Sequence, residues 1–151
     1  MEISNFLLDE IHSSFPCEEK DIRTIAPLKL AYLGDAVFEI IIRTLVIDHT
    51  GGPVKKLHSR TSSLVNAKSQ AELVAVMLDH LSEEEMAAFR HGRNAKTSSV
   101  AKNADIRDYR NATGLEALFG YLYLTKQTAR AIELLKLAMD ELNIEEAHYG
   151  K

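Results

Sequence analysis

The sequence predicts an all-α fold, and three of its features support that class. Apolar residues recur at helical spacing over long stretches, and no stretch alternates as a half-buried strand would. Only three prolines and seven glycines interrupt the chain. With 151 residues, of which 46% are hydrophobic, the chain has the length and the composition for one domain with a substantial core.

Start and stop signals divide the first half of the chain. A short helix is predicted within residues 1–15, followed by a loop at Pro16. Pro27 suits the first turn of a long helix that reaches Asp48, since two glycines and a proline follow within residues 50–53. Residues 53–80 are predicted to be helical, with a break near Ser62.

The second half begins with a capping box. Ser82 is the expected N-cap, and Glu85 the third residue, of a short helix that reaches Gly92. Residues 93–104 are basic and have no apolar period, so this segment is expected to be the least structured part of the middle of the chain. The remaining chain is predicted to form two helical segments and a frayed tail, at residues 105–124, 128–142 and 145–151.

The long predicted helix is apolar almost all the way round, which is typical of a helix inside a protein. Asp35 lies in its middle. A buried carboxylate without a partner is unfavourable, so Asp35 is expected to be hydrogen-bonded, ion-paired or bound to a metal ion. A purely structural partner, such as an arginine or backbone donors, is an alternative to a functional site. Glu39, one turn further on, could join the same site or pair with Arg43 at i+4.

Glu116 is the second unusual acid, because it interrupts a segment, residues 112–124, that is otherwise nearly free of charge. Gly120, on the same side of that helix, would let a neighbouring helix approach closely. If the helices of Asp35 and Glu116 cross, the two carboxylates can share a cation. Mg²⁺ fits such a site, since it takes oxygen ligands and often only one or two protein carboxylates.

Two basic segments stand out in a chain whose formal net charge is −4. Residues 51–71 contain four lysines and arginines and no acid, and residues 90–110 contain six against two acids. These segments form a candidate phosphate-binding surface, and an ordinary solvated face is the alternative.

Other chemistries lack their sequence signatures. The six histidines show no zinc-ligand spacing, Gly51-Gly52 lacks the lysine of a phosphate-binding loop, and Ser98-Ser99 lacks a hydrolase nucleophile motif. The single Cys17 is expected to be a free thiol in a reducing cytosol. No signal peptide or membrane span is predicted, so a cytoplasmic location is expected.

Two segments resemble the ribonuclease III family. Residues 30–37 (Leu-Ala-Tyr-Leu-Gly-Asp-Ala-Val) are similar to the signature that carries the family's catalytic aspartate. Residues 115–124 are similar to its second motif, Glu-Ala-Leu-Ile-Gly-Ala followed by apolar residues. Residues 92–96 and Tyr109-Arg110 are typical of the Mini-ribonuclease III branch, which lacks a double-stranded-RNA-binding domain. The resemblance covers about residues 22–142.

The resemblance implies a catalytic domain at residues 22–142, between an N-terminal extension (1–21) and a C-terminal tail (143–151). It implies that Asp35 and Glu116 are the catalytic and metal-binding residues, with Mg²⁺ as the ion and Mn²⁺ as a substitute. Full-length family members carry additional acids at four positions where this chain has other residues, so the site is reduced to two carboxylates; these positions are Leu28, Ala31, Lys68 and Thr113.

The resemblance also implies a two-fold homodimer, with Tyr32 near its interface, that cuts double-stranded or structured RNA into products with 5′-phosphate and 3′-hydroxyl ends. For the Mini branch it implies maturation of the 23S ribosomal RNA precursor, helped by a ribosomal protein. The candidate RNA contacts form two groups. The first lies in the segment 93–104 and consists of Arg93, Asn94, Lys96 and Lys102. The second, outer group lies earlier in the chain and consists of Lys55, Lys56, Arg60 and Lys68. Two alternatives stay open: a related fold that binds RNA or the ribosome without cleavage, and a helical dimerisation domain that binds no nucleic acid.

Overall fold

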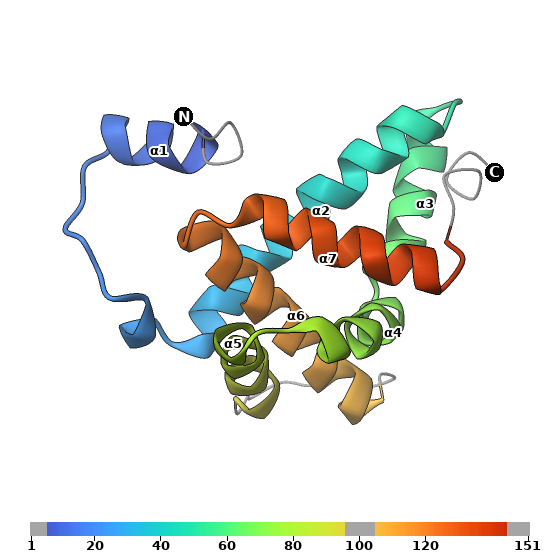
Figure 1. Cartoon of the computed structure of the whole chain (residues 1–151). Helices are drawn as coiled ribbons and strands as arrows, with labels where there is room; N and C mark the ends of the chain where they lie inside the picture. Colours follow the sequence, from blue (N-terminus) through green and yellow to red (C-terminus); the bar gives the residue numbers. More distant parts are fainter. Residues whose placement is uncertain (1–5, 96–104, 145–151) are drawn as a thin grey trace.

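The computed structural model describes residues 6–95 and 105–144, and within these ranges every regular element is a helix (Figure 1). The all-α prediction is confirmed. The segment 96–104 and the tail predicted to fray, 145–151, lie outside the described residues. The elements in chain order are α1 (Phe6–Ser14), η2 (Ile22–Thr24), α2 (Pro27–His49), α3 (Val54–Val65), α4 (Ala67–Met77), η3 (Leu78–His80), α5 (Glu83–Asn94), α6 (Ile106–Leu124) and α7 (Thr128–Glu141).

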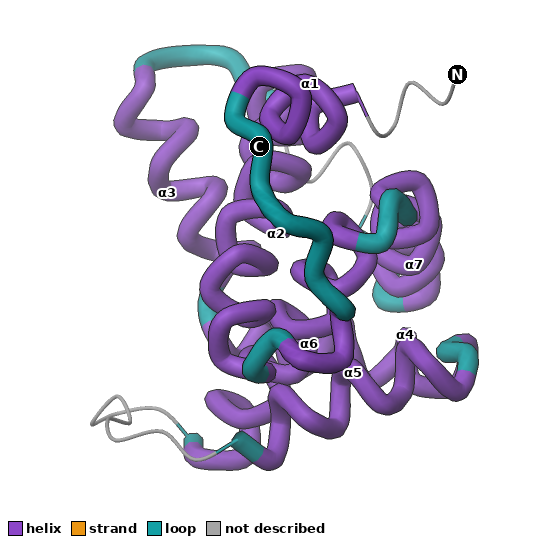
Figure 2. Tube along the Cα trace, turned by 90° about the vertical axis from the view of Figure 1, so that its left-hand side faces the viewer, coloured by secondary structure: helices purple, strands orange, loops and turns teal. Residues whose placement is uncertain are grey.

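Helix α6 is the centre of the molecule, because α2, α4, α5 and α7 all pack against it (Figures 1 and 2). Its side chains Leu115, Leu118, Phe119 and Leu122 are fully buried in the main core. The ring of Phe119 meets that of Phe38 on α2 edge-on, with centroids 5.6 Å apart. The sequence predicts that α2 lies inside the protein, but α6 is the central helix because it is covered on more sides.

Local capping explains where several helices begin. Asn66 ends α3 and caps α4 by accepting a hydrogen bond from the backbone of Ser69, 2.9 Å away. The break between these helices therefore lies at Asn66 and not near Ser62, as the sequence predicted. The predicted capping box of Ser82 and Glu85 is confirmed at the start of α5. Asp105 caps α6 in the same manner as Asn66 caps α4.

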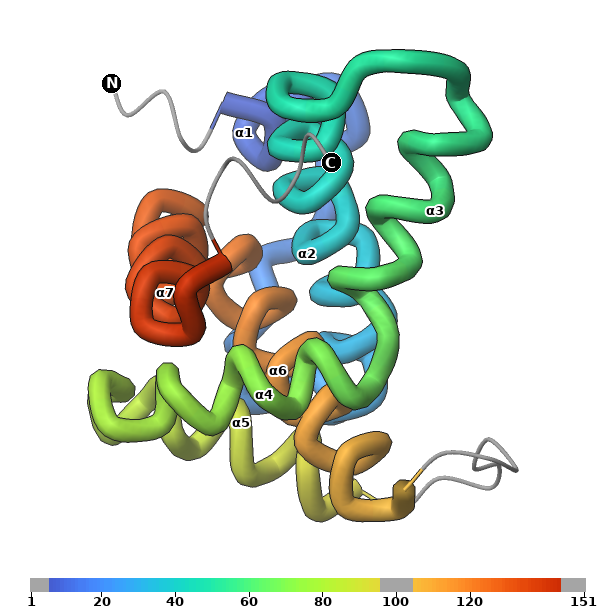
Figure 3. Tube along the Cα trace, turned by 90° about the vertical axis from the view of Figure 1, so that its right-hand side faces the viewer, coloured from blue at the N-terminus to red at the C-terminus, as the bar shows by residue number. Residues whose placement is uncertain are grey.

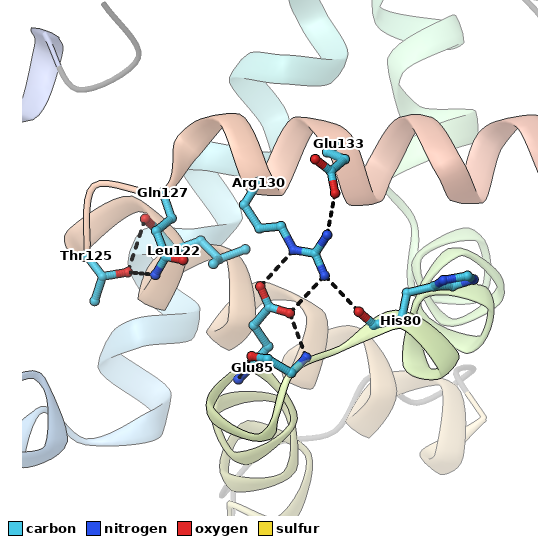
Figure 4. A network of polar contacts seen from close by, with 8 residues as sticks. His80, Glu85, Leu122, Thr125, Gln127, Arg130 and Glu133 are labelled. Atoms are coloured by element: carbon cyan, nitrogen blue, oxygen red, sulfur yellow. Dashed lines mark hydrogen bonds and ion pairs between the residues drawn. The ribbon is translucent and has the colours of Figure 1, made fainter. Parts of the chain in front are cut away.

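Glu85 has a second role that fastens α5 to α7. Its carboxylate accepts a hydrogen bond from Nε of Arg130 at 2.9 Å, and the same guanidinium binds the carbonyl oxygen of His80 at 2.7 Å (Figure 4). The Arg130 guanidinium and the capping bond from Ser82 lower the pKa of Glu85, although burial opposes them. Because the Glu85 side chain is only 6% exposed, its paired charge is a structural contact that sets the position of α7.

Two glycines allow α2 and α6 to cross in backbone contact. A Cβ added at Gly34 would lie 1.6 Å from the carbonyl oxygen of Glu116, and one at Gly120 would lie 2.0 Å from that of Leu30. No other residue type fits at either position without separating the helices. The close approach predicted for Gly120 is therefore confirmed, and its counterpart on α2 is Gly34.

Helix α2 is not buried all round, and that part of the sequence prediction is wrong. Tyr32, Ile40 and Ile47 are 85%, 62% and 68% exposed, whereas Phe38 and Ile42 on the opposite side are fully buried. Helices α3, α5 and α6 pack against α2, and Figure 3 shows α3 beside it. The exposed apolar side chains form a stripe that these helices leave uncovered. A stripe of this kind on a soluble helix is typical of a protein contact surface.

Helix α1 lies at the edge of the molecule, at the end of an extended connection (Figure 1). Leu8 is buried and Asp9 pairs with Lys126 at 3.2 Å, which attaches the helix near the turn between α6 and α7. Among the described residues, no helix combines the length and the hydropathy needed to cross a membrane.

Candidate active site

The crossing of α2 and α6 brings Asp35 and Glu116 together. Asp35 directly follows Gly34 along α2, and Glu116 supplies the carbonyl that Gly34 touches. The two carboxyl groups come within hydrogen-bonding reach of each other, since a hydrogen bond with Asp35 contributes to the pKa of Glu116. The convergence expected from the two isolated acids is therefore present, and its cause is the absence of a side chain at two helix positions.

The two acids differ in exposure. Asp35 is exposed, so the prediction that its carboxylate is buried is wrong, although it does interact with a hydrogen-bonding neighbour, Glu116. The reason is that Asp35 borders the uncovered stripe of α2. Glu116 is half-buried beneath it, and burial together with the negative charge of Asp35 raises the pKa of Glu116 to about 8.

Gln70 lies next to this pair. It follows the α4 N-cap by one turn, is only 3% exposed, and its side chain acts on the Glu116 carboxyl, whose pKa it lowers against the larger effects of burial and Asp35. Nevertheless its Nε2 completes no hydrogen bond of acceptable geometry within residues 6–95 and 105–144. Gln70 is therefore a buried polar side chain whose amide group lies beside the Glu116 carboxyl without completing a well-formed hydrogen bond.

The donor set fits a hard divalent cation. Two carboxyl groups share one place, where burial and, to a smaller extent, the negative charge of Asp35 disfavour the ionised form of Glu116 and raise its pKa to about 8. A divalent cation would compensate that charge, and Mg²⁺ is commonly held by one or two carboxylates plus water and substrate phosphate. In the part of the chain that is described, no cluster of three or more acidic, histidine or cysteine side chains could hold a metal ion. The site is thus limited to two protein carboxylates.

Glu39 does not join the pair. Its carboxylate lies 3.5 Å from a guanidinium nitrogen of Arg43, and both side chains are largely exposed. The i,i+4 pairing that the sequence offered as an alternative is the observed arrangement.

A basic cleft lies between the end of α5 and the start of α6. The cleft has a volume of about 570 Å³ and is lined by Arg93, Asn94, Arg107, Arg110 and Asn111, with apolar contributions from two neighbours. Beside the cleft the two helices pack tightly at Gly92, where an added Cβ would lie 2.5 Å from that of Ala117. Arg110 precedes Glu116 by six residues, or about 9 Å along the helix axis.

The structure changes the context of the other predicted RNA contacts. Arg93 and Asn94 belong to the last turn of α5 and not to an irregular segment, as the sequence predicted, and they bond to each other at 3.1 Å. Lys55, Lys56 and Lys68 are exposed on α3 and α4, away from the α5–α6 cleft. Arg60 is half-buried, and its Nε has no hydrogen-bond partner among the described residues. The remaining two, Lys96 and Lys102, lie outside the described residues.

Sequence reasoning missed three residues at these sites. Arg107 and Arg110 were counted in a basic segment but not predicted to contact RNA, although their spacing on one helix face was readable. Gln70 gave no signal beyond being a polar residue within an apolar helix pattern, because its position beside Glu116 depends on the packing of α4 on α6.

Comparisons with known proteins agree with this architecture. The family model described as the ribonuclease III domain matches residues 28–127, which include Asp35, Gln70 and Glu116. The crystal structure of protein FN1578 from Fusobacterium nucleatum is similar, with a TM-score of 0.72 and 30% identity, over 82% of this chain and 99% of that chain. The chain therefore belongs to the ribonuclease III family, and it is an endoribonuclease.

Within that family, the similarity is to proteins named Mini-ribonuclease 3. The one from Clostridium tetani is 44% identical over 81% of this chain and 82% of its own length. The one from Staphylococcus aureus is 36% identical over 83% of this chain and 96% of its own length. The ribonuclease III family acts on double-stranded RNA and generally depends on a divalent metal ion.

Proposed function

We propose that this chain cuts double-stranded or structured RNA at the Asp35–Glu116 pair with the help of Mg²⁺. The observation that carries the proposal is the convergence of these two carboxyl groups at the glycine crossing, with the pKa of Glu116 raised to about 8. Structural ion pairs also perturb pKa values, but here the perturbing neighbour is a second acid, which favours a cation site. Mn²⁺ would serve as a substitute because it accepts the same oxygen ligands.

The two acids take different parts in the reaction. A divalent ion bound there would lower the pKa of a water ligand and neutralise charge on the scissile phosphate. Asp35, being exposed, is the carboxylate that an RNA phosphate can approach. Glu116, whose pKa is raised in the ion-free site, would hold the ion as a carboxylate, with its proton released to solvent on binding. Attack of water on the phosphorus atom, with the 3′-oxygen as the leaving group, would leave 5′-phosphate and 3′-hydroxyl ends, as in the family.

Contacts with phosphates would position the RNA. Double-stranded RNA presents its backbone and 2′-hydroxyls rather than readable base edges, so a cleft lined by arginines and asparagines suits it. The proposed contacts within the α5–α6 cleft are Arg93, Asn94, Arg107 and Arg110. Lys55, Lys56 and Lys68 would contribute more weakly from α3 and α4, because they are exposed and lie away from the cleft.

A homodimer is proposed on the uncovered stripe of α2. Tyr32, Ile40 and Ile47 would be buried against the same residues of a second copy, in the isologous manner of a two-fold interface. Because Asp35 borders this stripe, the two sites of the dimer would lie on one side of it and could act on opposite RNA strands. We further propose the 23S ribosomal RNA precursor as the substrate, with a ribosomal protein as helper, and residues 22–142 as the catalytic domain. This part of the proposal derives from the relatives named Mini-ribonuclease 3.

The test compares the wild type with Asp35→Asn on a long RNA duplex in Mg²⁺. The wild type should cut the duplex and spare a single strand, whereas Asp35→Asn should lose about 10³-fold or more in rate, because it removes a charge that acts in the transition state. Since Asp35 is exposed, the variant should keep its melting temperature. Glu39→Gln is the matched control, one turn away on the same helix, and should retain activity.

Two results would count against the proposal. If the wild type leaves both duplex RNA and ribosomal precursor RNA intact in Mg²⁺, these RNAs are excluded as substrates. A loss of folding in Asp35→Asn would instead give that residue a structural role.

A further inference from the structure

Gln70 is the strongest feature of the site that the proposed function does not use. It is 3% exposed, and its Nε2 is buried without a hydrogen-bond partner among the described residues. Most buried amide groups are hydrogen-bonded, and leaving a donor unsatisfied is unfavourable. An apolar side chain of the same length, such as methionine, would fill this place without that cost. A glutamine at this position therefore indicates a role for its amide group toward a nearby acceptor.

The neighbouring acceptor is the carboxyl group of Glu116. The Gln70 side chain already acts on that group, although Nε2 does not complete a bond of acceptable geometry. The backbone of Gln70 is held in place, because its N–H donates to the carbonyl oxygen of Asn66 at 3.0 Å and because α4 packs directly on α6. A fixed helix can thus hold the amide at one side of Glu116 while Asp35 lies near another.

We propose that Gln70 is a positioning residue, whose Nε2 donates to one carboxylate oxygen of Glu116 in the loaded site and turns the other oxygen toward the ion shared with Asp35. The inference rests on the proposed function, since it requires a divalent cation between these acids. Side chains that orient a metal-binding carboxylate in this way commonly change metal affinity by about 10- to 100-fold when they are removed. Gln70 would not touch the RNA.

The experiment measures Mn²⁺ binding and RNA cleavage for Gln70→Met, with Ser69→Ala as the matched control. Methionine keeps the length of glutamine and removes the amide. Ser69 is adjacent on the same helix, and its hydroxyl donates to the carbonyl of Ser63 at 2.9 Å, away from the carboxyl pair. Titration would be followed by the electron paramagnetic resonance signal of free Mn²⁺, and the melting temperature would be recorded for every variant.

Gln70→Met should bind Mn²⁺ about 10-fold or more weakly and show a lower kcat at an unchanged KM for RNA, while its melting temperature stays equal or rises. Ser69→Ala should show the reverse pattern, with a slightly lower melting temperature and unchanged Mn²⁺ binding. A purely structural glutamine would lower the melting temperature and leave Mn²⁺ affinity intact.

The experiment distinguishes a failure of the positioning role of Gln70 from a failure of the proposed function. If the wild type binds Mn²⁺ and Asp35→Asn does not, but Gln70→Met binds it as the wild type does, the positioning role is overturned and the proposed function survives. If the wild type binds no Mn²⁺ that depends on Asp35, the metal site fails and the role of Gln70 is overturned with it.

Discussion

Asp35, Glu116 and Gln70 make up a site in which each side chain has a different degree of contact with solvent. Asp35 is exposed, Glu116 is half-buried and Gln70 is fully buried. This gradient explains why burial together with the charge of Asp35 shifts the pKa of Glu116 so far. It also separates their tasks, because the exposed acid can meet a phosphate while the deeper groups hold the geometry. The chemistry of the site thus depends on how deeply each side chain is buried as well as on its residue type.

The raised pKa of Glu116 predicts a pH dependence of stability in the ion-free protein. The folded carboxyl titrates near pH 8, whereas an unfolded one titrates near its ordinary value of 4.5. Between these values the folded state binds more protons than the unfolded state, so the free energy of unfolding falls as the pH rises. Thermal melts in EDTA should show the wild type losing stability from about pH 5 to about pH 8, while Glu116→Gln loses less over this range. Equal slopes for the two proteins would contradict the shift.

At the scale of elements, the crossing of α2 and α6 is the contact that creates the site. Gly34 and Gly120 remove the two side chains that would hold the helices apart, and the adjacent residues Asp35 and Glu116 then meet. The α5–α6 contact at Gly92 has the same basis and aligns the arginines of the basic cleft. Helix α6 takes part in both contacts, so it links the carboxylate pair to the cleft.

Gly34→Ala should destabilise the protein strongly. The added methyl group would lie 1.6 Å from a backbone oxygen that cannot move without α6, and overpacking of this kind costs about 3 kcal/mol or more. Urea denaturation should report the loss as a lower midpoint. Gly51→Ala is the matched control, since an added Cβ there meets nothing within 4 Å and its stability should change little. A Gly34→Ala protein as stable as the control would mean that the helices do not cross as described.

At the scale of the whole molecule, two surfaces of the described residues bear on the proposed function. One is the exposed apolar stripe of α2, and the other is the basic cleft between α5 and α6. Basic side chains gather in one cleft although the net charge of the chain is −4, which supports the proposed binding of a polyanion there. The two surfaces suit the homodimer and the RNA binding that we propose.

The cleft predicts how RNA affinity depends on salt. Each cationic side chain that neutralises a phosphate contributes about 1 to the slope of log K against log salt concentration. Arg107→Gln and Arg110→Gln should therefore each lower the magnitude of that slope by about 1 in a duplex-binding titration without divalent ions. Arg23→Gln, which changes an exposed arginine paired with Asp21 on η2, should leave the slope unchanged. Unchanged slopes for both cleft variants would exclude the cleft from RNA binding.

The stripe on α2 predicts a dimer that one substitution can break. Tyr32 is 85% exposed, so Tyr32→Arg should fold normally but place a charge in the proposed interface. Sedimentation velocity should show the wild type as a dimer and Tyr32→Arg as a monomer. Ile132→Arg, at an exposed apolar position on α7, should remain dimeric. A monomeric wild type at micromolar concentration would end the proposal of a two-fold interface.

Local sequence patterns predicted much of the fold. The capping box at Ser82, the stop after Asp48 and the helical period of residues 112–124 predicted elements that the structure contains. The boundary at Asn66 was missed, because one residue there both ends α3 and caps α4, so the helical pattern shows almost no gap. Asp35 and Glu116 were recognised because a charged residue in an apolar segment is visible without any tertiary information.

The sequence by itself determined the helices, the two isolated acids and the basic segments, since each depends on neighbours along the chain. Only the tertiary structure decided that α6 and not α2 is central, that Asp35 is exposed, and that Gln70 faces Glu116. These features follow from which helix faces are covered and how closely two backbones approach. Burial and distance between segments remote in sequence arise from packing, and packing has no local pattern from which it could be read.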